Sequence, residues 1–190
     1  MSTHTHTPDD TKISQAALRL AAAKGWSQVT LEAVAKTAKM PVAKLNARFK
    51  TPADLAPVIA EAVDREAFAL AGKVPGTPQD VLFDLLMARF DVLQKNRKAI
   101  LSMAEAARQD RRLSCALTRA TVGGVYRLID AAQLEAPPRP VLAAGLGAVY
   151  GWAFFVWSRD DSRDMAKTMA AVDRALRLCG KAVILLQKRG

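Results

Sequence analysis

Apolar and polar positions recur with helical spacing through most of this 190-residue chain, and most clearly over residues 30–50. The apolar positions of that stretch are Leu31, Val34, Ala35, Ala38, Leu45 and Phe49. Thr30 precedes the first of them as a helix cap, and Pro41 occupies a place favoured for the first residue of a second helix. The pattern therefore predicts two short helices joined by a tight turn, with Leu45 and Phe49 on the buried side of the second.

The other side of the second helix carries small and basic side chains, namely Val42, Ala43, Lys44, Asn46, Ala47 and Arg48. Such a surface lets a helix enter the major groove of B-DNA, which is about 12 Å wide. Lys44 and Asn46 are the candidates for base edges, since lysine suits guanine and asparagine suits adenine. The candidates for phosphate contacts are Thr30, Lys39, Arg48 and Lys50. Residues 41–49, beginning at Pro41, are thus predicted to read duplex DNA.

The rest of the chain is also helical in pattern, and no alternating β pattern of any length is present. Helices are expected over residues 11–24, 51–71, 77–93, 96–109, 113–134, 141–157 and 161–187. Thr51 and Thr77 each precede a proline and an aspartate, a combination that starts a helix. The predicted fold class is all-α with about nine helices. Residues 1–10 are expected to form a disordered tail, 11–56 a three-helix helix-turn-helix domain, and 57–190 a helical ligand-binding and dimerisation domain.

Residues 141–157 contain no charged side chain. A membrane span needs about 20 apolar residues, and this run is shorter, rich in glycine and flanked by amphipathic helices. We therefore expect a helix that faces a second subunit, with glycines one turn apart that let another backbone approach closely. The expected dimer contacts are Gly147, Gly151, Trp152, Met165, Met169, Val172 and Leu176. The basic and apolar end, residues 181–189, suits dimer packing better than contact with a membrane surface.

The formal net charge is +10, which favours a polyanionic partner, either nucleic acid or an anionic membrane surface. Its distribution narrows the choice. Residues 11–56 contain eight basic side chains, Lys12, Arg19, Lys24, Lys36, Lys39, Lys44, Arg48 and Lys50, against the acids Glu32 and Asp54. A concentration of positive charge around a helix-turn-helix is the pattern expected for contact with DNA phosphates.

The residues that enzymes and metal sites need are scarce in this chain. Its two histidines, His4 and His6, lie in the expected tail, so no histidine base is available to a folded body. No glycine-rich phosphate loop and no metal-ligand spacing is present, so we expect no catalysis, no metal and no cofactor. Cys115 and Cys179 are too few for a disulfide framework and residues 1–10 are polar, which together favour the cytoplasm.

Residues 13–55 resemble the N-terminal domain of TetR-family repressors. The shared landmarks are, in chain order, Lys24-Gly25-Trp26, Val29-Thr30-Leu31, Ala33-Val34-Ala35-Lys36 with Ala38, Leu45, Phe49-Lys50, and Ala53-Asp54-Leu55. The chain has Lys39, Pro41, Asn46, Arg48 and Pro52 where the family usually has glycine, serine, tyrosine, histidine and lysine. In the family the last three contact phosphates, and Arg48 keeps a donor at one of those places. The resemblance implies a homodimeric repressor that binds a double-stranded DNA operator.

Residues 81–178 carry a second resemblance, in segments 82–91, 145–150 and 157–176. They are similar to a bacterial branch of TetR-like proteins related to the lipid-binding accessory proteins of ubiquinone biosynthesis. The residues expected to line a pocket for a small hydrophobic ligand or lipid are Phe83, Met87, Phe90, Met103, Tyr126, Trp152, Phe155 and Met169. Two functions stay open: a ligand-modulated regulator, and a lipid- or quinone-binding accessory protein with a vestigial helix-turn-helix. The basic charge around residues 30–50 favours the regulator.

Overall fold

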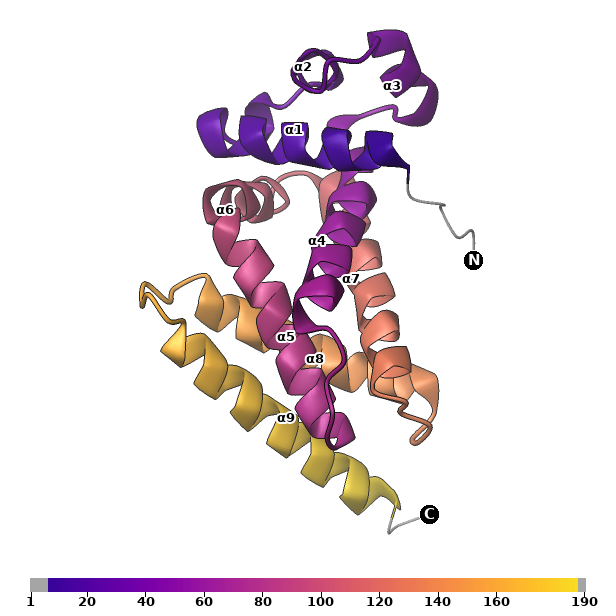
Figure 1. Ribbon diagram of the computed structural model, residues 1–190, viewed down its shortest axis with the longest axis vertical. Coiled ribbons are helices and arrows are strands. Elements are labelled where there is room, and N and C mark those ends of the chain that lie inside the picture. Colours follow the sequence, from indigo (N-terminus) through magenta and orange to yellow (C-terminus); the bar gives the residue numbers. More distant parts are fainter. Residues whose placement is uncertain (1–6, 188–190) are drawn as a thin grey trace. The chain divides into compact units, whose positions relative to one another are not determined.

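The computed structural model describes residues 7–187 of the chain and the side chains of residues 7–181. Within that part the chain forms nine α-helices and no strand (Figure 1), so the predicted all-α fold class is confirmed. The helices are α1 (Pro8–Lys24), α2 (Leu31–Thr37), α3 (Val42–Arg48), α4 (Ala56–Ala71), α5 (Pro78–Lys95), α6 (Arg97–Ala106), α7 (Arg111–Ala131), α8 (Arg139–Trp157) and α9 (Ala166–Gln187). Two short 3₁₀ helices span Trp26–Gln28 and Pro52–Leu55.

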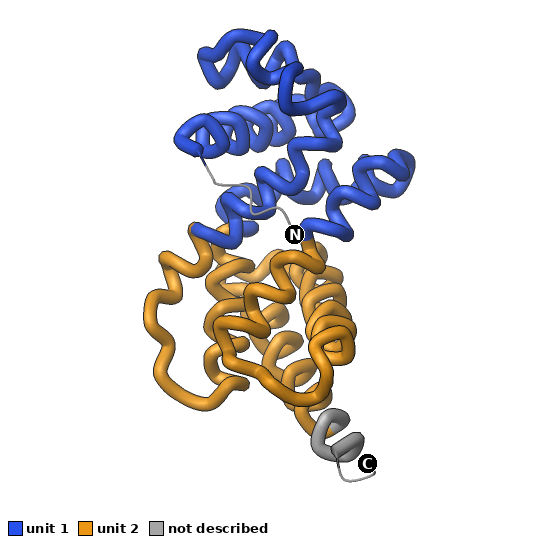
Figure 2. Tube along the Cα trace, turned by 90° about the vertical axis from the view of Figure 1, so that its right-hand side faces the viewer, with its two compact units in different colours: residues 1–65, 93–120 blue, residues 66–92, 121–190 orange. Residues whose placement is uncertain are grey.

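The chain divides into two compact units, which Figure 2 shows in blue and orange. The N-terminal unit comprises residues 1–65 and 93–120, and the C-terminal unit comprises residues 66–92 and 121–190. All three boundaries along the chain fall inside helices, because α4, α5 and α7 each contribute residues to both units. The boundary at residue 56 that we expect between the helix-turn-helix domain and the rest of the chain is a different division, and it stays a prediction.

The first helix begins earlier than the sequence pattern suggested. It starts at Pro8 and not at Thr11, so the predicted tail of residues 1–10 is wrong for residues 8–10. The cause is a capping box: the backbone N–H and the hydroxyl of Thr7 both donate to Asp10 Oδ2, at 2.8 and 3.0 Å. Thr7, Pro8 and Asp10 therefore repeat the start signal of Thr51 and Thr77. His4 and His6 lie outside the described residues.

The N-terminal unit has a core built where α1 packs against α2 and α6. Ile13 and Ala17 from α1 and Val34 from α2 are almost completely buried. Gly25 ends α1 with a positive φ of 83°, which glycine adopts without strain, and turns the chain so that Trp26 is buried. The Trp26 backbone N–H donates to Ser102 Oγ on α6 at 3.2 Å. Helix α2 packs against α1 of this framework, and α3 packs against α2.

The C-terminal unit is organised around packed aromatic rings. Phe90 of α5 is completely buried, and its ring lies 5.8 Å from Tyr150 and 6.2 Å from Trp157, both on α8. Helices α8 and α9 pack closely along their length. A methyl group at Gly145 would lie only 3.0 Å from Cys179 Sγ, so that glycine allows the close approach of α9. The aromatic rings fix one side of α8 and leave its other side exposed.

Helix α8 contains the uncharged stretch of residues 141–157. Of the helices searched in the described part of the chain, it is the one whose length and composition would suit a membrane span, and 28% of its apolar window is buried within the chain. Those two properties do not distinguish a lipid-facing helix from one that faces a protein partner. In either case, the side chains on the exposed face of α8 are the ones that a lipid or a protein partner would contact.

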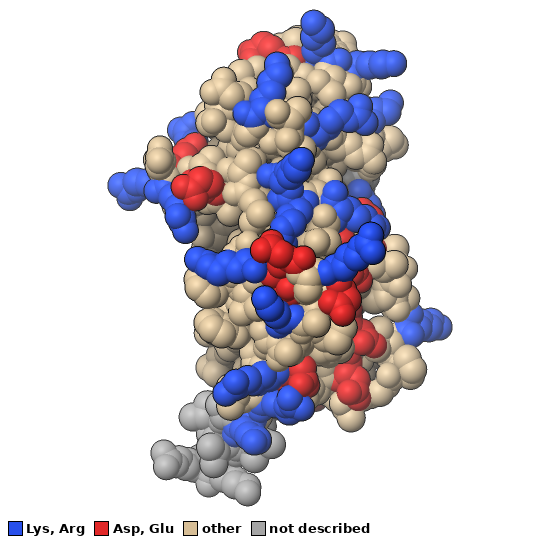
Figure 3. Space-filling view, turned by 90° about the vertical axis from the view of Figure 1, so that its left-hand side faces the viewer, with Lys and Arg blue, Asp and Glu red and all other residues tan. Residues whose placement is uncertain are grey.

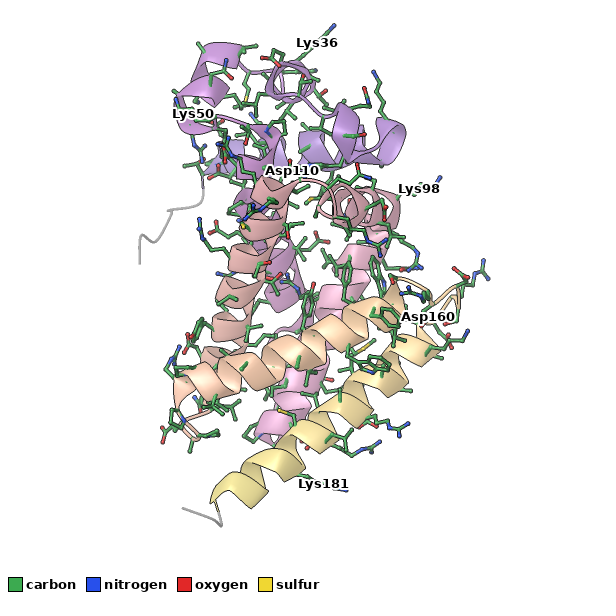
Figure 4. The ribbon with its side chains drawn as sticks, turned by 180° about the vertical axis from the view of Figure 1, so that it is seen from behind. Lys36, Lys50, Lys98, Asp110, Asp160 and Lys181 are labelled. Atoms are coloured by element: carbon green, nitrogen blue, oxygen red, sulfur yellow. The ribbon has the colours of Figure 1, made fainter. Side chains whose placement is uncertain are left out.

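The loop between α8 and α9 replaces a helix start that we predicted at Asp161. Helix α9 begins at Ala166 instead, because Asp160 organises the preceding residues. Asp160 Oδ2 accepts hydrogen bonds from the backbone N–H and the hydroxyl of Thr168, both at 2.8 Å. Its other oxygen accepts from the backbone N–H of Ser162 at 3.1 Å and from the Ser162 hydroxyl. A buried carboxylate therefore ties the loop to the first turn of α9 (Figure 4).

Candidate nucleic-acid interface

Helices α2 and α3 form a helix-turn-helix. The Thr30 hydroxyl caps α2 by accepting from the Ala33 backbone N–H at 3.2 Å, as the sequence predicts. The chain then turns through Lys39, whose φ of 54° lies in the left-handed region. Pro41 is the residue that precedes α3, with Val42 as its first helical residue, one place later than we expected. The turn is closed by the Met40 backbone N–H, which donates to the Ala35 carbonyl at 3.0 Å.

One side of α3 is anchored and the other is open. Leu45 is 1% exposed and Phe49, just past the helix, is 6% exposed, so these two residues fasten α3 to the unit. The residues predicted to meet DNA are all exposed: Pro41, Val42, Ala43, Lys44, Asn46, Ala47 and Arg48. These side chains therefore remain accessible at the surface of the N-terminal unit.

A groove beside α3 brings several predicted contacts together. It has a volume of about 450 Å³ and is lined by Thr30, Leu31, Glu32, Asn46, Phe49, Lys50 and Pro52. The Lys50 ammonium donates to the Asn46 carbonyl at 3.4 Å, which directs this cation along the end of α3. Thr30, Asn46 and Lys50 come from different elements yet border one hollow. Their hydroxyl, amide and ammonium groups suit the oxygen atoms of a nucleic-acid backbone.

The first turn of α1 reaches α3 through Asp10. Its Oδ2 caps α1, and its Oδ1 accepts from Arg48 Nη2 at 2.5 Å. The Asp10 carboxylate is 6% exposed and the Arg48 side chain is 35% exposed. Burial would raise the pKa of Asp10, but the hydrogen bonds from Thr7 and Arg48 outweigh it and hold the pKa below the usual range. The Arg48 guanidinium also lies over the Phe49 ring, 5.0 Å from its centroid.

Asp9 makes a parallel contact on the outer side of the same turn. Its carboxylate forms an ion pair with the Lys44 ammonium, in which both side chains remain accessible. Lys44 and Arg48, two of the predicted DNA contacts, are therefore each paired with an acid of α1. The sequence pattern does not single out either acid, since it predicts a disordered tail over residues 1–10. The capping signal at Thr7 would have revealed them, since it predicts that Asp9 and Asp10 are helical.

Alanine at Arg48 is expected to lower the free energy of unfolding by only about 1 kcal/mol, because the ion pair between Arg48 and Asp10 is partly open to solvent. Alanine at Asp10 is expected to cost about 2 kcal/mol, because it removes the helix cap as well. The double variant should show a coupling of about 1 kcal/mol in a urea unfolding cycle followed by circular dichroism.

Arg108 provides the matched control for that cycle. Its pair with Glu105, at 3.3 Å, has both side chains more than 60% exposed. Arg108→Ala should therefore change the free energy of unfolding by less than about 0.5 kcal/mol. A coupling near zero between Asp10 and Arg48 would show that the pair does not hold α3.

Basic side chains surround the helix-turn-helix. On the face drawn in Figure 3 they project from the N-terminal helices with few acidic side chains among them. Lys36 lies on α2 and Lys50 lies just after the end of α3, and both are labelled in Figure 4, where the Lys36 side chain points away from the rest of the chain. Asp54, one of the few acids in this region, accepts the backbone N–H groups of Lys50 and Thr51 at its Oδ2, each at 2.8 Å, and so fixes the chain just after α3.

Comparison with known protein families identifies this domain. Residues 13–57 match the family model described as bacterial regulatory proteins, tetR family. The match covers α1 from Ile13 onward, the helix-turn-helix and the start of α4, and it does not include the first turn of α1 with Asp9 and Asp10. The N-terminal domain belongs to the TetR family. Helix α3 is therefore the second helix of a TetR-family helix-turn-helix, and the resemblance noted in the sequence is confirmed.

Solved structures show that the similarity extends over the whole fold. A TetR transcriptional regulator from Nitrosomonas europaea has 20% sequence identity and a TM-score of 0.73, covering 92% of this chain and 99% of its own. A TetR transcriptional regulator from Rhodococcus sp. RHA1 has 21% identity and a TM-score of 0.62, covering 90% and 94%. A complex of SmeT with triclosan has 18% identity and a TM-score of 0.56, covering 90% and 91%.

At these identities the structures establish a TetR fold and nothing more specific. A search of curated proteins found no match. The second resemblance, to accessory proteins of ubiquinone biosynthesis, gains no support from the comparisons.

The eight residues predicted to line a ligand pocket are not brought together by this TetR fold. Phe90 is completely buried in the aromatic core, and Met103 lies in the N-terminal unit. Trp152, Phe155 and Met169 are each about half exposed on the outer faces of α8 and α9. Phe83, Met87 and Tyr126 are half-buried, and the Tyr126 ring lies 5.4 Å from the Arg139 guanidinium. On α8, helical spacing could not separate inward from outward positions, because both faces of that helix are apolar.

The predicted dimer contacts separate into two groups. Met165, Val172 and Leu176 are buried within the chain, so they hold α9 in place and are not accessible to a partner. Gly151, Trp152 and Met169 are exposed, and Gly147 is half-buried. We call the exposed residues Val141, Gly151, Trp152, Phe155 and Met169 the α8–α9 face. It is apolar, and the Trp152 ring stacks on Phe155 with centroids 5.7 Å apart.

Proposed function

We propose that this protein is a dimeric transcriptional regulator that binds duplex DNA through α3 and responds to a small hydrophobic ligand. The observation that carries the proposal is the exposed face of α3, with Lys44 and Asn46 on a helix whose opposite side is anchored by Leu45 and Phe49. This face lies in a TetR-family domain with a marked excess of basic side chains. An exposed, small and basic helix face has the shape and charge that a major groove accepts.

In the proposed complex, Lys44 and Asn46 contact base edges and other groups hold the backbone. Lysine donates to guanine O6 and N7, whereas asparagine pairs with adenine N6 and N7. We propose that Thr30, Lys39 and Lys50 contact phosphates, since all three are exposed beside α3. Arg48 contributes less than the sequence alone suggested, because Asp10 already accepts from its guanidinium. We assign Arg48 chiefly to positioning α3.

The α8–α9 face is the proposed dimer interface. A methyl group added at Gly147 or Gly151 would meet nothing within 4 Å, so packing within the chain does not require either glycine. Glycine within a helix costs about 0.5–1 kcal/mol relative to alanine, and a close partner helix would offset that cost. A two-fold dimer presents two copies of α3, which would read half-sites about 34–36 Å apart or a multiple of that spacing.

Ligand binding is proposed for the C-terminal unit, by analogy with the SmeT structure that contains triclosan. A cavity lined by Arg89, Thr121, Gly124, Val125, Leu128 and Tyr150 has a volume of only about 10 Å³. That space suits a single water molecule, so a larger ligand would bind a form in which the helices have separated. A ligand that binds one conformation more tightly shifts the population towards that conformation. In the dimer, this shift would change the distance between the two copies of α3.

The direct test measures binding to the promoter beside the protein's own gene by fluorescence anisotropy, from 50 to 200 mM salt. Lys50→Ala is expected to weaken binding to every sequence alike and to flatten the salt dependence by about 0.9 for each half-site, because it removes one phosphate contact. Asn46→Ala is expected to cost about 1–3 kcal/mol at one base pair of each half-site and to relax the sequence preference there.

Each variant serves as the control for the other, since one should change the salt slope and the other the sequence preference. If folded, dimeric protein does not bind DNA at 50 mM salt, that result would contradict the proposal that it is a DNA-binding regulator. Recovery of a bound quinone or other lipid from such a protein by organic extraction would then support the accessory function.

A further inference from the structure

The two acids of the first turn of α1 treat the basic residues of α3 differently. Asp10 is buried, caps its own helix and holds Arg48 at 2.5 Å, so this contact is part of the framework. Asp9 has no other hydrogen bond among those described, and its side chain is 28% exposed. Lys44 is 56% exposed and projects from the face that the duplex would meet. The outer pair can therefore open while the inner pair keeps α3 in place.

The environment of Asp9 keeps it charged. The hydrogen bond from Lys44 is the chief cause that lowers its pKa, and Lys12 and Arg48 contribute through their charges. At neutral pH the carboxylate is an anion next to the ammonium group with which we expect DNA to interact. It offers Lys44 the same kind of partner that a phosphate oxygen would offer.

We propose that Asp9 is a specificity-determining residue that competes with DNA for Lys44 and weakens binding to non-cognate sequence. The inference rests on the proposed function and names a further determinant at the same interface. On a non-cognate duplex, a phosphate that takes Lys44 from Asp9 exchanges one exposed ion pair for another, so little is gained. A cognate site offers guanine O6 and N7 as well, and only there does the release of Lys44 add to affinity.

Counterion release provides a second consequence. A lysine that neutralises a phosphate releases bound cations from DNA, and this release makes binding depend on salt. A lysine already neutralised by Asp9 brings less net charge to the duplex, since the carboxylate comes with it. The Asp9 carboxylate also repels neighbouring phosphates. The pair therefore lowers the electrostatic part of binding, which every DNA sequence shares.

The experiment compares wild type, Asp9→Asn, Lys44→Ala and the double variant. Each full-length protein is titrated into a random duplex and into the best-bound promoter duplex from 50 to 200 mM salt. Asp9→Asn should tighten binding to the random duplex roughly two- to five-fold and steepen the salt slope by about 0.9 for each half-site, with a smaller gain on the promoter duplex. In the Lys44→Ala background the same change should have little effect on either duplex.

Asp9→Ser is the second variant, because serine keeps the first turn of α1 polar while removing the carboxylate. Circular dichroism and thermal unfolding establish that all five proteins are folded. Equal tightening with and without Lys44 would overturn the inference, because it would show a general charge effect. Equal tightening on both duplexes, or none, would also overturn it. If neither wild type nor Asp9→Asn binds any duplex, the proposed DNA-binding function is wrong, and the inference about Asp9 is then wrong as well.

Discussion

Arginine in place of Trp152 is expected to convert the dimer into a monomer, raising the dimer dissociation constant at least about 100-fold. Trp152 is 55% exposed, and its ring stacks on Phe155, which the Arg159 guanidinium covers at 3.8 Å from the ring centroid. These contacts hold a large aromatic surface rigid before any partner arrives, which lowers the entropy cost of association. A buried arginine without a counter-charge at the centre of an apolar interface is strongly unfavourable. Sedimentation velocity over a concentration series measures the change.

Leu70 supplies the control for this substitution. It is 54% exposed on α4, outside the α8–α9 face, so Leu70→Arg makes the same chemical change without touching the proposed interface. It should leave the dimer dissociation constant within about two-fold of wild type. A Trp152→Arg protein that stays dimeric, or a wild type that is monomeric, would show that the α8–α9 face is not the interface.

Loss of the dimer should also reduce affinity for a two-half-site duplex. Each copy of α3 would then bind alone, without the high local concentration that the first contact gives the second. This effect separates dimer variants from variants of α3 itself, because the affinity for an isolated half-site should not change. The two surfaces of the protein can therefore be tested independently.

The helix-turn-helix was predictable because its signals are local. Thr30 caps α2, and Leu45 and Phe49 anchor α3, as their order in the sequence indicates. Lys39 shows the limit of such reasoning. Its φ of 54° explains why the TetR family usually has glycine there, and a lysine in that conformation costs roughly 1 kcal/mol. The intrinsic preference of lysine does not predict a left-handed conformation. Contacts with the surrounding residues impose this conformation on Lys39.

The faces of the C-terminal helices were not predictable in the same way. Met165 lies just before α9, and Met169 lies four residues later, within it. Helical spacing would put both on one face, yet Met165 is 5% exposed and Met169 is 45% exposed. The loop organised by Asp160 places Met165 outside the helix, which breaks the helical spacing. On α8 both faces are apolar, so the pattern of apolar residues does not say which one meets the core. Such assignments depend on tertiary contacts between α5, α8 and α9.

Alanine in place of Asp160 is expected to lower the free energy of unfolding by about 3 kcal/mol. Asp160 is 1% exposed, and Thr168, which donates to it twice, is completely buried. Removing the carboxylate leaves the Thr168 amide and hydroxyl without their acceptor in a place that water does not reach. Urea unfolding followed by circular dichroism measures the loss. Asp164→Ala is the control, since its exposed carboxylate accepts only from the Ala166 backbone N–H, at 3.2 Å, among the described contacts.

The same carboxylate makes the stability of the protein depend on pH. Burial would raise the pKa of Asp160, but the hydrogen bonds from Ser162 and Thr168 outweigh it and hold the pKa well below the usual range. A group whose pKa is lower in the folded state stabilises that state above its unfolded pKa, which for aspartate is about 3.9. That contribution is lost as the pH falls from there towards the folded pKa. Wild type should therefore lose stability below about pH 4 more steeply than Asp160→Asn, which has no such proton to bind. Parallel losses for the two proteins would show that other carboxylates dominate acid unfolding and that Asp160 contributes through shape alone.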